Sequence, residues 1–462
     1  MFSPTTLHTV PATATTNHIL VFPYPAQGHM LALLDLTHQL ALHGFKITIL
    51  VTPKNLPLLN SLLTTHPNSV NPLVLPFPTH PNLPFGVENV KDIGNAGNAP
   101  IILSLKKLEE QVIQWFQSNP SPPQAILSDF FLGYTNNWAH QLGIPRFAFF
   151  STRAFLSLII DHVLENIDTL WNLHEINFPN IPRSPTFVHH QLPSMFKAYK
   201  NGDTNWISCK NSMLENFKSY GIVFNTYYAL EAEYLDYIKM KVGHDRVYSV
   251  GPLNAIGLSR VNPDSGIGYD VLNWVDKWSD GSVLFVCFGS QKMLTKPQME
   301  ALALGLERSG VRFIWVVKAE TSHMVPDGFE KRVADRALIV HGWAPQTEIL
   351  SHKAIGGFVS HCGWNSTLES IMAGVMILAW PMEADQFVNA RLLVEDMGSA
   401  VGLCEGEDTV PDSEMLSRVI EKSMGRNIVQ RERAKVIREM AFEAIKSGGS
   451  SMKDLDALVK KI

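Results

Sequence analysis

The stretch WAPQTEILSHKAIGGFVSHCGWNSTLESIMAGVMILAWPMEADQ, residues 343–386, predicts the fold more clearly than any other part of the chain. It contains two short apolar runs, 356–360 and 375–380, separated by a His-Cys-Gly turn and a helical pattern that opens with Trp-Asn-Ser. A strand, a tight turn, a helix and a second strand in this order are typical of a parallel sheet covered by helices. The stretch therefore predicts an α/β domain with a helix that begins at the carboxyl end of a strand.

The turn before this helix is suited to binding a nucleotide diphosphate. The first N–H groups of a helix have no partner within it, and its N-terminus carries partial positive charge, so a diphosphate can bind there without a metal ion. Asn365 and Ser366 can add side-chain donors, and His361 another. Glu369 can accept hydrogen bonds from ribose hydroxyls, and Trp343 offers a flat face for a base. Each residue alone is more often structural, but their joint occurrence in one order favours a nucleotide site.

The alternation of apolar runs and helical patterns extends along the whole chain, and 462 residues suit two domains of roughly 200 residues or more each. The first set of expected strands lies at 18–22, 46–51, 73–77, 125–128, 146–150 and 221–225. The second set lies at 283–288, 313–317, 337–340, 356–360 and 375–380. Residues 165–203, rich in Pro, His and Asn, are expected to form loops near the cleft between the domains.

These patterns predict the division of the chain into domains. We expect a disordered tail over 1–17, an N-terminal domain over 18–251 and a second domain over 270–440. Residues 252–269 are rich in Gly, Pro, Ser and Asn and predict a linker between them. The residues 441–462 are expected to form a C-terminal helix that packs back toward the N-terminal domain.

Composition excludes several classes of protein. A formal net charge of −5 and scattered basic residues argue against nucleic acid or an anionic membrane surface as a partner. Four dispersed cysteines without a CxxC pair argue against a disulfide scaffold and a structural zinc site. The chain contains no run of 18 apolar residues, so no membrane span is predicted. The first 17 residues have no apolar segment typical of a secretory signal. We expect a cytoplasmic protein.

The N-terminal half contains candidates of its own at PYPAQGHMLALLDL, residues 23–36. The strand 18–22 ends in a Pro-rich turn, and His29 begins the helical pattern that follows. Ligands of α/β proteins gather at the carboxyl ends of strands, where Asp129 also lies. A packing histidine and a helix-capping aspartate are the structural alternatives. If the two side chains meet, the carboxylate holds the imidazole in one tautomer and stabilises the imidazolium.

The segment 343–386 resembles, in order, spacing and length, the donor-binding motif of plant family 1 UDP-sugar glycosyltransferases. The resemblance covers nearly the full chain. It implies a GT-B fold, in which two Rossmann-like parallel-sheet domains face each other across a cleft, with the acceptor bound mainly by the N-terminal domain and the UDP-sugar by the C-terminal one. It also implies that His29 is the general base and that Asp129, in a motif like SDFF, is its partner.

The resemblance assigns the remaining candidates to the UDP-sugar. The uracil ring is expected to stack on Trp343. The ribose is expected near Gln346 and Glu369. The diphosphate is assigned to His361, Asn365, Ser366 and Ser290, the last from an FGS turn. The sugar hydroxyls are expected to face Trp364, Asp385 and Gln386. In one place the chain departs from the family, since Met376 stands where proline is usual, and a change in packing is expected there.

The implied reaction is a single displacement that inverts the anomeric centre and gives a β-O-glycoside. Gln386 favours glucose as the donor sugar, since relatives with His at this position often use galactose or rhamnose; UDP-rhamnose, UDP-xylose and UDP-galactose stay open. The acceptor is expected to be a plant phenolic such as a flavonoid, so the enzyme is expected to act in plant secondary metabolism. For a flat acceptor, an apolar wall can come from Phe130, Phe131, Trp138, Phe155 and Trp206, although core packing is the more common role of each. No metal or other cofactor is expected, and the protein is expected to act as a monomer.

Other classes fit the sequence less well. A nicotinamide oxidoreductase would need a GxGxxG motif after its first strand, where this chain has a single glycine. An α/β hydrolase would need GxSxG, which does not occur. A non-catalytic UDP-sugar-binding protein stays possible on the donor motif alone, and His29 with Asp129 is the feature against it.

Overall fold

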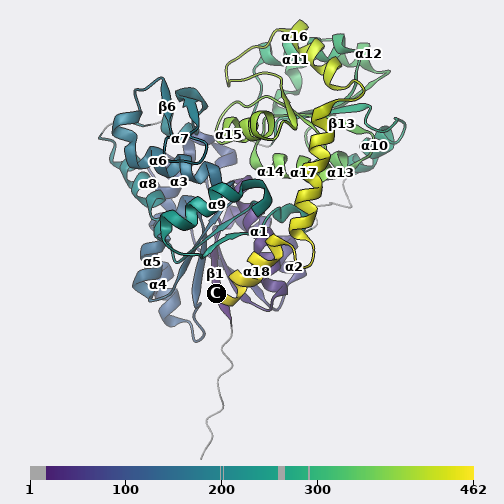
Figure 1. Ribbon diagram of the computed structural model, residues 1–462. Coiled ribbons are helices and arrows are strands. Elements are labelled where there is room, and N and C mark those ends of the chain that lie inside the picture. Colours follow the sequence, from purple (N-terminus) through teal and green to yellow (C-terminus); the bar gives the residue numbers. More distant parts are fainter. Residues whose placement is uncertain (1–16, 198, 201, 259–265, 290–291) are drawn as a thin grey trace, which may run out of the picture.

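The computed structural model describes residues 17–197, 199–200, 202–258, 266–289 and 292–462 (Figure 1). Most of the predicted N-terminal tail, the middle of the predicted linker and Ser290 lie outside the described residues. The described chain forms two parallel sheets with helices packed on both faces of each (Figure 1). The expected fold class, two Rossmann-like α/β domains, is confirmed.

The N-terminal sheet has the strand order β3-β2-β1-β4-β5-β8-β9. The bounds are β1 His18–Phe22, β2 Lys46–Val51, β3 Val70–Val74, β4 Ala125–Asp129, β5 Arg146–Phe150, β8 Gly221–Phe224 and β9 Val247–Ser249. Alternate residues of β1 enter different cores, with Ile19 and Val21 on one side and Leu20 and Phe22 on the other. The sheet is therefore buried on both faces, which explains its uninterrupted apolar runs.

The C-terminal sheet follows the order β12-β11-β10-β13-β14-β15. The bounds are β10 Val283–Cys287, β11 Arg312–Val317, β12 Ala337–His341, β13 Ile355–Ser360, β14 Ile377–Ala379 and β15 Ala400–Gly402. In both sheets the order reverses beside the first strand, between β1 and β4 and between β10 and β13. Ligands of open α/β sheets bind at such reversal points. Two potential ligand-binding edges therefore arise, one in each domain.

The sequence patterns missed short or irregular elements. Strand β3 lies at 70–74 and not at 73–77, because its partner strand β2 ends at Val51 and the chain then turns into a short helix that begins at Pro53. Residues 165–203 are not only loops. Helix α6 (Ala154–Leu170) reaches into this segment, and β6 (Glu175–Asn177) pairs with β7 (Thr186–Val188), because Ile176 and Phe187 are buried in the N-terminal core.

The C-terminal segment consists of two helices, α17 (Val429–Ile445) and α18 (Ser450–Lys461), where a single helix over 441–462 was expected. Helix α17 contributes Ala441 and other small or apolar residues to the core of the C-terminal domain. Helix α18 packs against β9, and its Leu455 and Leu458 are buried in the N-terminal core (Figure 1). The chain thus crosses back to the N-terminal domain after residue 445.

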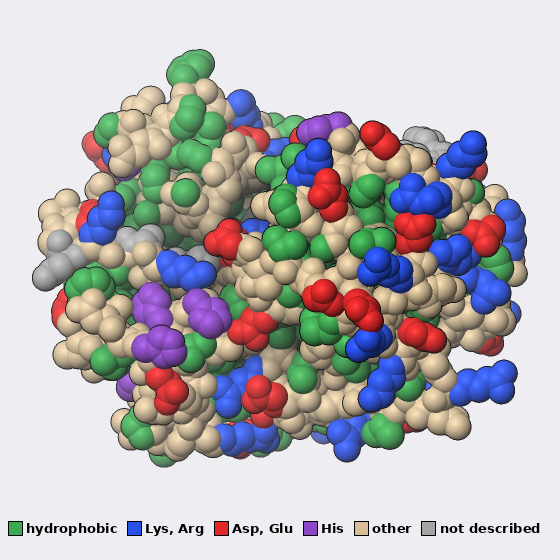
Figure 2. All heavy atoms as spheres, turned by 90° about the horizontal axis from the view of Figure 1, so that it is seen from above, with side chains coloured by type: hydrophobic (Ala, Val, Ile, Leu, Met, Phe, Trp, Pro, Cys, Tyr) green, Lys and Arg blue, Asp and Glu red, His purple; other side chains and the backbone are tan. Residues whose placement is uncertain are grey.

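The face of the molecule seen in Figure 2 shows no preference for one sign of charge, because basic and acidic side chains are interspersed on it. Among the helices of the described residues, none combines the length and the apolar composition needed to cross a bilayer.

Candidate active site

A cleft of about 900 Å³ lies between the two domains, at the carboxyl ends of both sheets. Both domains line it. The predicted site residues on its walls are His29, Trp343, Gln346, His361, Trp364, Asn365, Ser366, Glu369, Asp385 and Gln386. Asp129 lies behind His29 and is fully buried. The fold therefore brings together, around one cleft, residues that are more than 300 positions apart in the chain.

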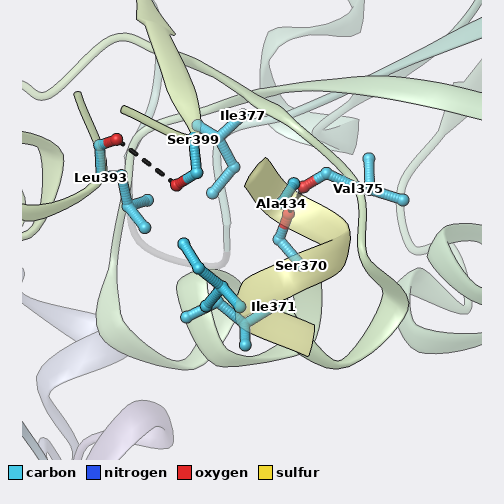
Figure 3. Close-up of a pocket in the computed structure, with 8 residues that line it drawn as sticks. Ser370, Ile371, Val375, Ile377, Leu393, Ser399 and Ala434 are labelled. Carbon is cyan, nitrogen blue, oxygen red and sulfur yellow. Dashed lines mark hydrogen bonds between the residues drawn. The ribbon is translucent and has the colours of Figure 1, made fainter. Parts of the chain in front are cut away.

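A second, much smaller void of about 10 Å³ lies inside the C-terminal domain (Figure 3). Apolar side chains such as Ile371 and Ile377 line it, and the hydroxyl of Ser399 donates to the carbonyl of Leu393 at 3.4 Å. A void of this size holds about one water molecule. It is a packing defect of the core and has no room for a sugar nucleotide.

His29 and Asp129 form a hydrogen-bonded pair at the reversal point of the N-terminal sheet. His29 is the third residue of α1 (Gln27–Leu42), and Asp129 ends β4. The distance from Nδ1 of His29 to Oδ2 of Asp129 is 3.0 Å. The other carboxylate oxygen accepts the N–H of Phe131 at 2.9 Å, which fixes the carboxylate plane. Because Nδ1 is engaged, Nε2 is the ring nitrogen left to meet a substrate in the cleft.

Aromatic rings surround the imidazole. Phe130 stacks on it with ring centres 5.2 Å apart, Phe131 lies at 4.7 Å, and Tyr24 meets it edge-on at 5.4 Å. The phenol of Tyr24 donates to Oδ1 of Asn98 at 2.7 Å. The His29 side chain is nevertheless 22% exposed. The rings hold its orientation and leave one edge open to the cleft.

Of the aromatic residues considered for an acceptor wall, two line the cleft and three do not. Phe130 and Phe131 are on its wall. Trp138, Phe155 and Trp206 are buried in the cores of the N-terminal domain. The side chains next to the base are therefore the ones positioned to contact an aromatic acceptor.

Arg146 supports the aspartate and was not predicted as a site residue. Its guanidinium donates to the backbone carbonyl of Asp129 at 3.3 Å, to the hydroxyl of Ser128 at 2.9 Å and to Oδ1 of Asn216 at 3.0 Å. Burial lowers the pKa of Arg146 to about 9. The sequence did contain a signal for this role, because Arg146 begins an otherwise apolar predicted strand. A buried arginine needs several hydrogen-bond partners, so it orders the groups around it.

The proposed phosphate turn lies at the reversal point of the C-terminal sheet. Helix α14 (Trp364–Ala373) begins directly after the turn that follows β13. His361 in this turn packs on Gly289, where a Cβ would lie only 2.7 Å from the ring and where φ is +71°. Glycine is therefore required there on two grounds. Burial, assisted by the charge of Lys318, lowers the pKa of His361 to about 4, so the ring is neutral at physiological pH.

The two predicted ribose residues are hydrogen-bonded to each other, and one of them also bonds to Ser366. Nε2 of Gln346 donates to the hydroxyl of Ser366 at 3.0 Å and to Oε2 of Glu369 at 2.5 Å. Trp343 is 50% exposed, although it is a large aromatic residue. An exposed indole in a cleft offers a stacking face for a planar ring.

Asn365 joins the two halves of the site. Its Nδ2 donates to the backbone carbonyl of Gly28 at 3.0 Å, so the first turn of α14 is bonded to the residue before His29. An amide nitrogen carries two N–H groups. Asn365 can therefore keep this bond and still offer an N–H to a phosphate.

At the predicted sugar end, Asp385 and Gln386 lie at the start of α15 (Gln386–Arg391). The Gln386 side-chain oxygen accepts the backbone N–H groups of Met382 and Glu383 at 2.9 and 3.0 Å. The oxygen is thus engaged within the protein, so the NH₂ group is the part of this side chain that could donate to a ligand of the cleft, which Gln386 lines. Burial raises the pKa of Asp385, although the amide of Asn389, which donates to it at 2.7 Å, acts in the opposite direction.

Trp364 also lines the cleft, and its side chain has a partner in the N-terminal domain. Its indole N–H donates to the carbonyl of Asn225 at 2.7 Å, and the ring is buried. The backbone of Trp364 is hydrogen-bonded to the Asp385 carboxylate. Met376 is fully buried in the C-terminal core.

Comparison with known proteins agrees with this geometry. Residues 248–433 match the family model for UDP-glucoronosyl and UDP-glucosyl transferases. The chain is 52% identical to UDP-glycosyltransferase 89A2 of Arabidopsis thaliana, covering 96% of this chain and 95% of that protein. It is 46% identical to the flavonol 3-O-glucosyltransferase UGT89B1 of the same plant, covering 97% and 96%.

Solved structures agree as well. Crystal structures of Arabidopsis thaliana UGT89C1, complexed with quercetin and with UDP-L-rhamnose, share 36% identity with a TM-score of 0.79, covering 96% of this chain and 98% of that one. The two reversal points, the buried His–Asp pair and the turn before α14 are thus found in a chain closely similar to sugar-transferring enzymes. The chain belongs to the plant family 1 UDP-glycosyltransferases and is an enzyme of that family.

Proposed function

We propose that the enzyme transfers glucose from UDP-glucose to a hydroxyl group of a small plant phenolic, such as a flavonoid, with inversion to a β-O-glycoside. The observation that carries this proposal is the 3.0 Å pair of His29 and Asp129, which faces the donor wall across one cleft. A binding protein would have no need of an oriented base at this place.

In the proposed reaction, Nε2 of His29 accepts the proton of the acceptor hydroxyl. The hydroxyl oxygen forms a bond to the anomeric carbon while the bond from that carbon to the β-phosphate oxygen breaks. Because a neutral imidazole is a much weaker base than a phenolate, proton transfer accompanies the attack and does not precede it. Asp129 stabilises the imidazolium that results.

The leaving UDP gains negative charge on its β-phosphate as this bond breaks. The N-terminus of α14 and the side chains of Asn365 and Ser366 supply donors in fixed positions, which is the arrangement that lowers the barrier to charge development. His361 is neutral here and acts through a hydrogen bond, not as a cation. The group can stabilise the product UDP without a metal ion.

Glucose is proposed on the basis of Gln386, whose NH₂ group can donate to a sugar hydroxyl beside the Asp385 carboxylate. A relative named as a flavonol 3-O-glucosyltransferase supports this choice. A relative solved with UDP-L-rhamnose keeps rhamnose as the principal alternative, followed by xylose and galactose. The acceptor class rests on Phe130 and Phe131 at the base and on the quercetin complex of a relative.

The test is a matrix of UDP-sugars against plant phenolics, with products identified by mass spectrometry and the anomeric configuration by NMR. A β-glucoside of a phenol, formed faster than any other glycoside, is the expected result. Binding of UDP-glucose without any product from the phenolics would contradict the proposal and indicate a non-catalytic UDP-sugar-binding protein. We also propose that a single chain suffices, which sedimentation of the active enzyme would check.

A further inference from the structure

A fully buried ion pair lies in the N-terminal domain beside the cleft. Arg153, directly before α6, and Glu231, in α9 (Tyr228–Val242), are both completely inaccessible, with Nε and Oε1 2.9 Å apart. Glu231 has a non-helical backbone (φ −137°, ψ 29°) inside α9. Burying two charges is costly, and a well-packed apolar pair is often as stable. The stability of the fold alone therefore does not explain why this buried ion pair is present.

Both oxygens of the Glu231 carboxylate also accept hydrogen bonds from backbone N–H groups. Oε2 of Glu231 accepts the N–H of Ala154 at 2.9 Å, and Oε1 accepts the N–H of Phe155 at 3.0 Å. The carboxylate therefore caps the first turn of α6, where a negative charge is favourable. These bonds fix the position from which the guanidinium of Arg153 extends.

The guanidinium reaches across the domain boundary. Its Nη1 donates to the carbonyl of Val388 in α15 at 3.1 Å. The Val388 side chain is fully buried in the hydrophobic core of the N-terminal domain, although the residue belongs to the C-terminal domain. The same guanidinium lies 5.9 Å from the ring of Trp364, whose indole is itself bonded to the N-terminal domain. Helix α15 is thus attached to the acceptor domain by a polar and an apolar contact.

Helix α15 begins with Gln386, two residues before Val388, and Asp385 directly precedes it. We propose that the Arg153–Glu231 pair is a positioning device, which holds α15, and with it Asp385 and Gln386, in register with the acceptor domain and so sets the discrimination between donor sugars. This inference rests on the proposed function, which assigns the sugar to these two residues. The hydrogen bond of the pair goes to α15, whereas the base and ribose residues lie on other elements, so we expect the pair to affect the binding of UDP much less than the recognition of the sugar.

The decisive variant is the double substitution Arg153→Met and Glu231→Gln. It leaves no buried charge, and the Gln side chain still offers an oxygen to the first N–H groups of α6, so the fold should be retained. The tether to Val388 is lost. A matched control is Ser451→Ala, which removes another buried hydrogen bond to the N-terminal domain, from Ser451 to the Gly251 carbonyl at 2.6 Å. Neither Ser451 nor Gly251 lines the cleft.

Calorimetry would give the affinities of wild type, double variant and control for UDP, UDP-glucose and UDP-galactose. We expect the double variant to bind UDP within about twofold of wild type, since distant sites are nearly independent. Its preference between the two UDP-sugars should fall about 10-fold, and kcat with a phenol should fall by a similar factor. For Arg153→Lys we expect a sugar preference and a kcat between those of wild type and the double variant. The lysine ammonium lacks the branched, planar guanidinium that reaches Glu231 and Val388 together. The control should keep the wild-type values.

Hydrogen exchange of the α15 amides provides a readout that needs neither acceptor nor turnover. Faster exchange in the double variant than in Ser451→Ala supports the tether. Unchanged exchange, an unchanged sugar preference, or an equal loss of affinity for UDP and for both UDP-sugars overturns the inference. Failure of wild type to form any glycoside would instead contradict the proposed function, while the binding ratios and the exchange rates would still decide the role of the pair.

Discussion

His29 shows how a common side chain becomes a specific base through its surroundings. The ring is held by one carboxylate and three aromatic side chains, and only one edge meets the cleft. The carboxylate is in turn oriented by the N–H of Phe131 and by the backbone bond from Arg146. Proton acceptance is thus limited to Nε2 and to a hydroxyl that approaches from the cleft.

The first prediction at this scale concerns the base itself. His29→Ala should lower kcat for transfer to phenols by at least about 100-fold, the usual contribution of a positioned general base. The affinity for UDP, measured by calorimetry, should hardly change, because the donor motif lies on the other domain. Asp129→Asn should also lose activity, because the Phe131 N–H favours turning the amide NH₂ toward Nδ1 and so selects the wrong tautomer. A His29→Ala enzyme that keeps more than a few per cent of wild-type kcat would show that another group is the base.

The second prediction concerns Gln386. Gln386→His should lower kcat/KM for UDP-glucose by roughly 10-fold or more, the loss expected for one polar sugar contact. The substitution also removes the acceptor of the Met382 and Glu383 N–H groups, so KM should rise as kcat falls. Steady-state kinetics with UDP-glucose, UDP-galactose and UDP-rhamnose would measure the change. Unaltered glucose transfer in the variant, or a wild type that prefers UDP-rhamnose, would show that Gln386 does not read the sugar.

The third prediction follows from the neutral state of His361. Its pKa falls from 6.5 to about 4 on folding, so the unfolded chain binds more protons than the native one between these values. The titration of His361 therefore lowers the free energy of unfolding as the pH falls from about 6.5 to about 4. In His361→Gln, the midpoint of thermal unfolding should decline less steeply over this interval than in wild type. Parallel declines would mean that folding does not lower the pKa of His361.

At the scale of elements, α14 combines two tasks. Its N-terminus lies at the carboxyl end of β13, and Asn365 in its first turn bonds to Gly28 beside the base. One helix therefore positions both the leaving group and the acceptor machinery relative to each other.

The fourth prediction tests this helix as the stabiliser of UDP. Transfer should proceed at an unchanged rate after EDTA treatment and dialysis, because the helix terminus and its side-chain donors provide the charge stabilisation that Mg²⁺ supplies in other enzymes. Metal content would be checked by mass spectrometry of the same sample. Loss of turnover on chelation, followed by recovery on addition of a divalent cation, would contradict this account of the leaving group.

At the scale of the whole molecule, the two domains are joined by more than a linker. Polar bonds cross the cleft region from Asn365 to Gly28, from Trp364 to Asn225 and from Arg153 to Val388. Away from the cleft, α18 returns to the N-terminal domain, where Asp454 accepts the N–H and hydroxyl of Ser249 at 2.7 and 2.8 Å. These contacts hold the acceptor and donor halves of the site at a defined separation.

The fifth prediction concerns α18. Leu455→Ala should lower the free energy of unfolding by about 2–5 kcal/mol, the usual cost of a cavity at a fully buried leucine. Because Leu455 lies far from the cleft lining, kcat should stay close to wild type at temperatures where the variant is folded. Urea unfolding followed by fluorescence would measure the first quantity and a glycosylation assay the second. A stability loss below about 0.5 kcal/mol, the scale of surface substitutions, would mean that α18 does not complete the N-terminal core.

The amino-acid sequence alone was sufficient to predict the features that depend on short-range pattern. Apolar runs of five or six residues predicted the long strands of both sheets, because strands buried on both faces need no alternation. The turn before α14 was recognisable because a diphosphate site needs particular donors at neighbouring positions. Very short strands such as β9 and β15, of three residues each, left no such pattern and were missed.

Which side chains come into contact depends on the three-dimensional packing of the chain. His29 and Asp129 are 100 positions apart, and they pair because β1 and β4 are neighbours at the reversal of the strand order. The direction of the Trp364 indole, and the bond from Arg153 to a carbonyl 235 positions away, follow from how the domains pack. The physical reason is that local propensity fixes the elements, whereas the order of the strands and the burial of their faces determine the distances between side chains remote in sequence.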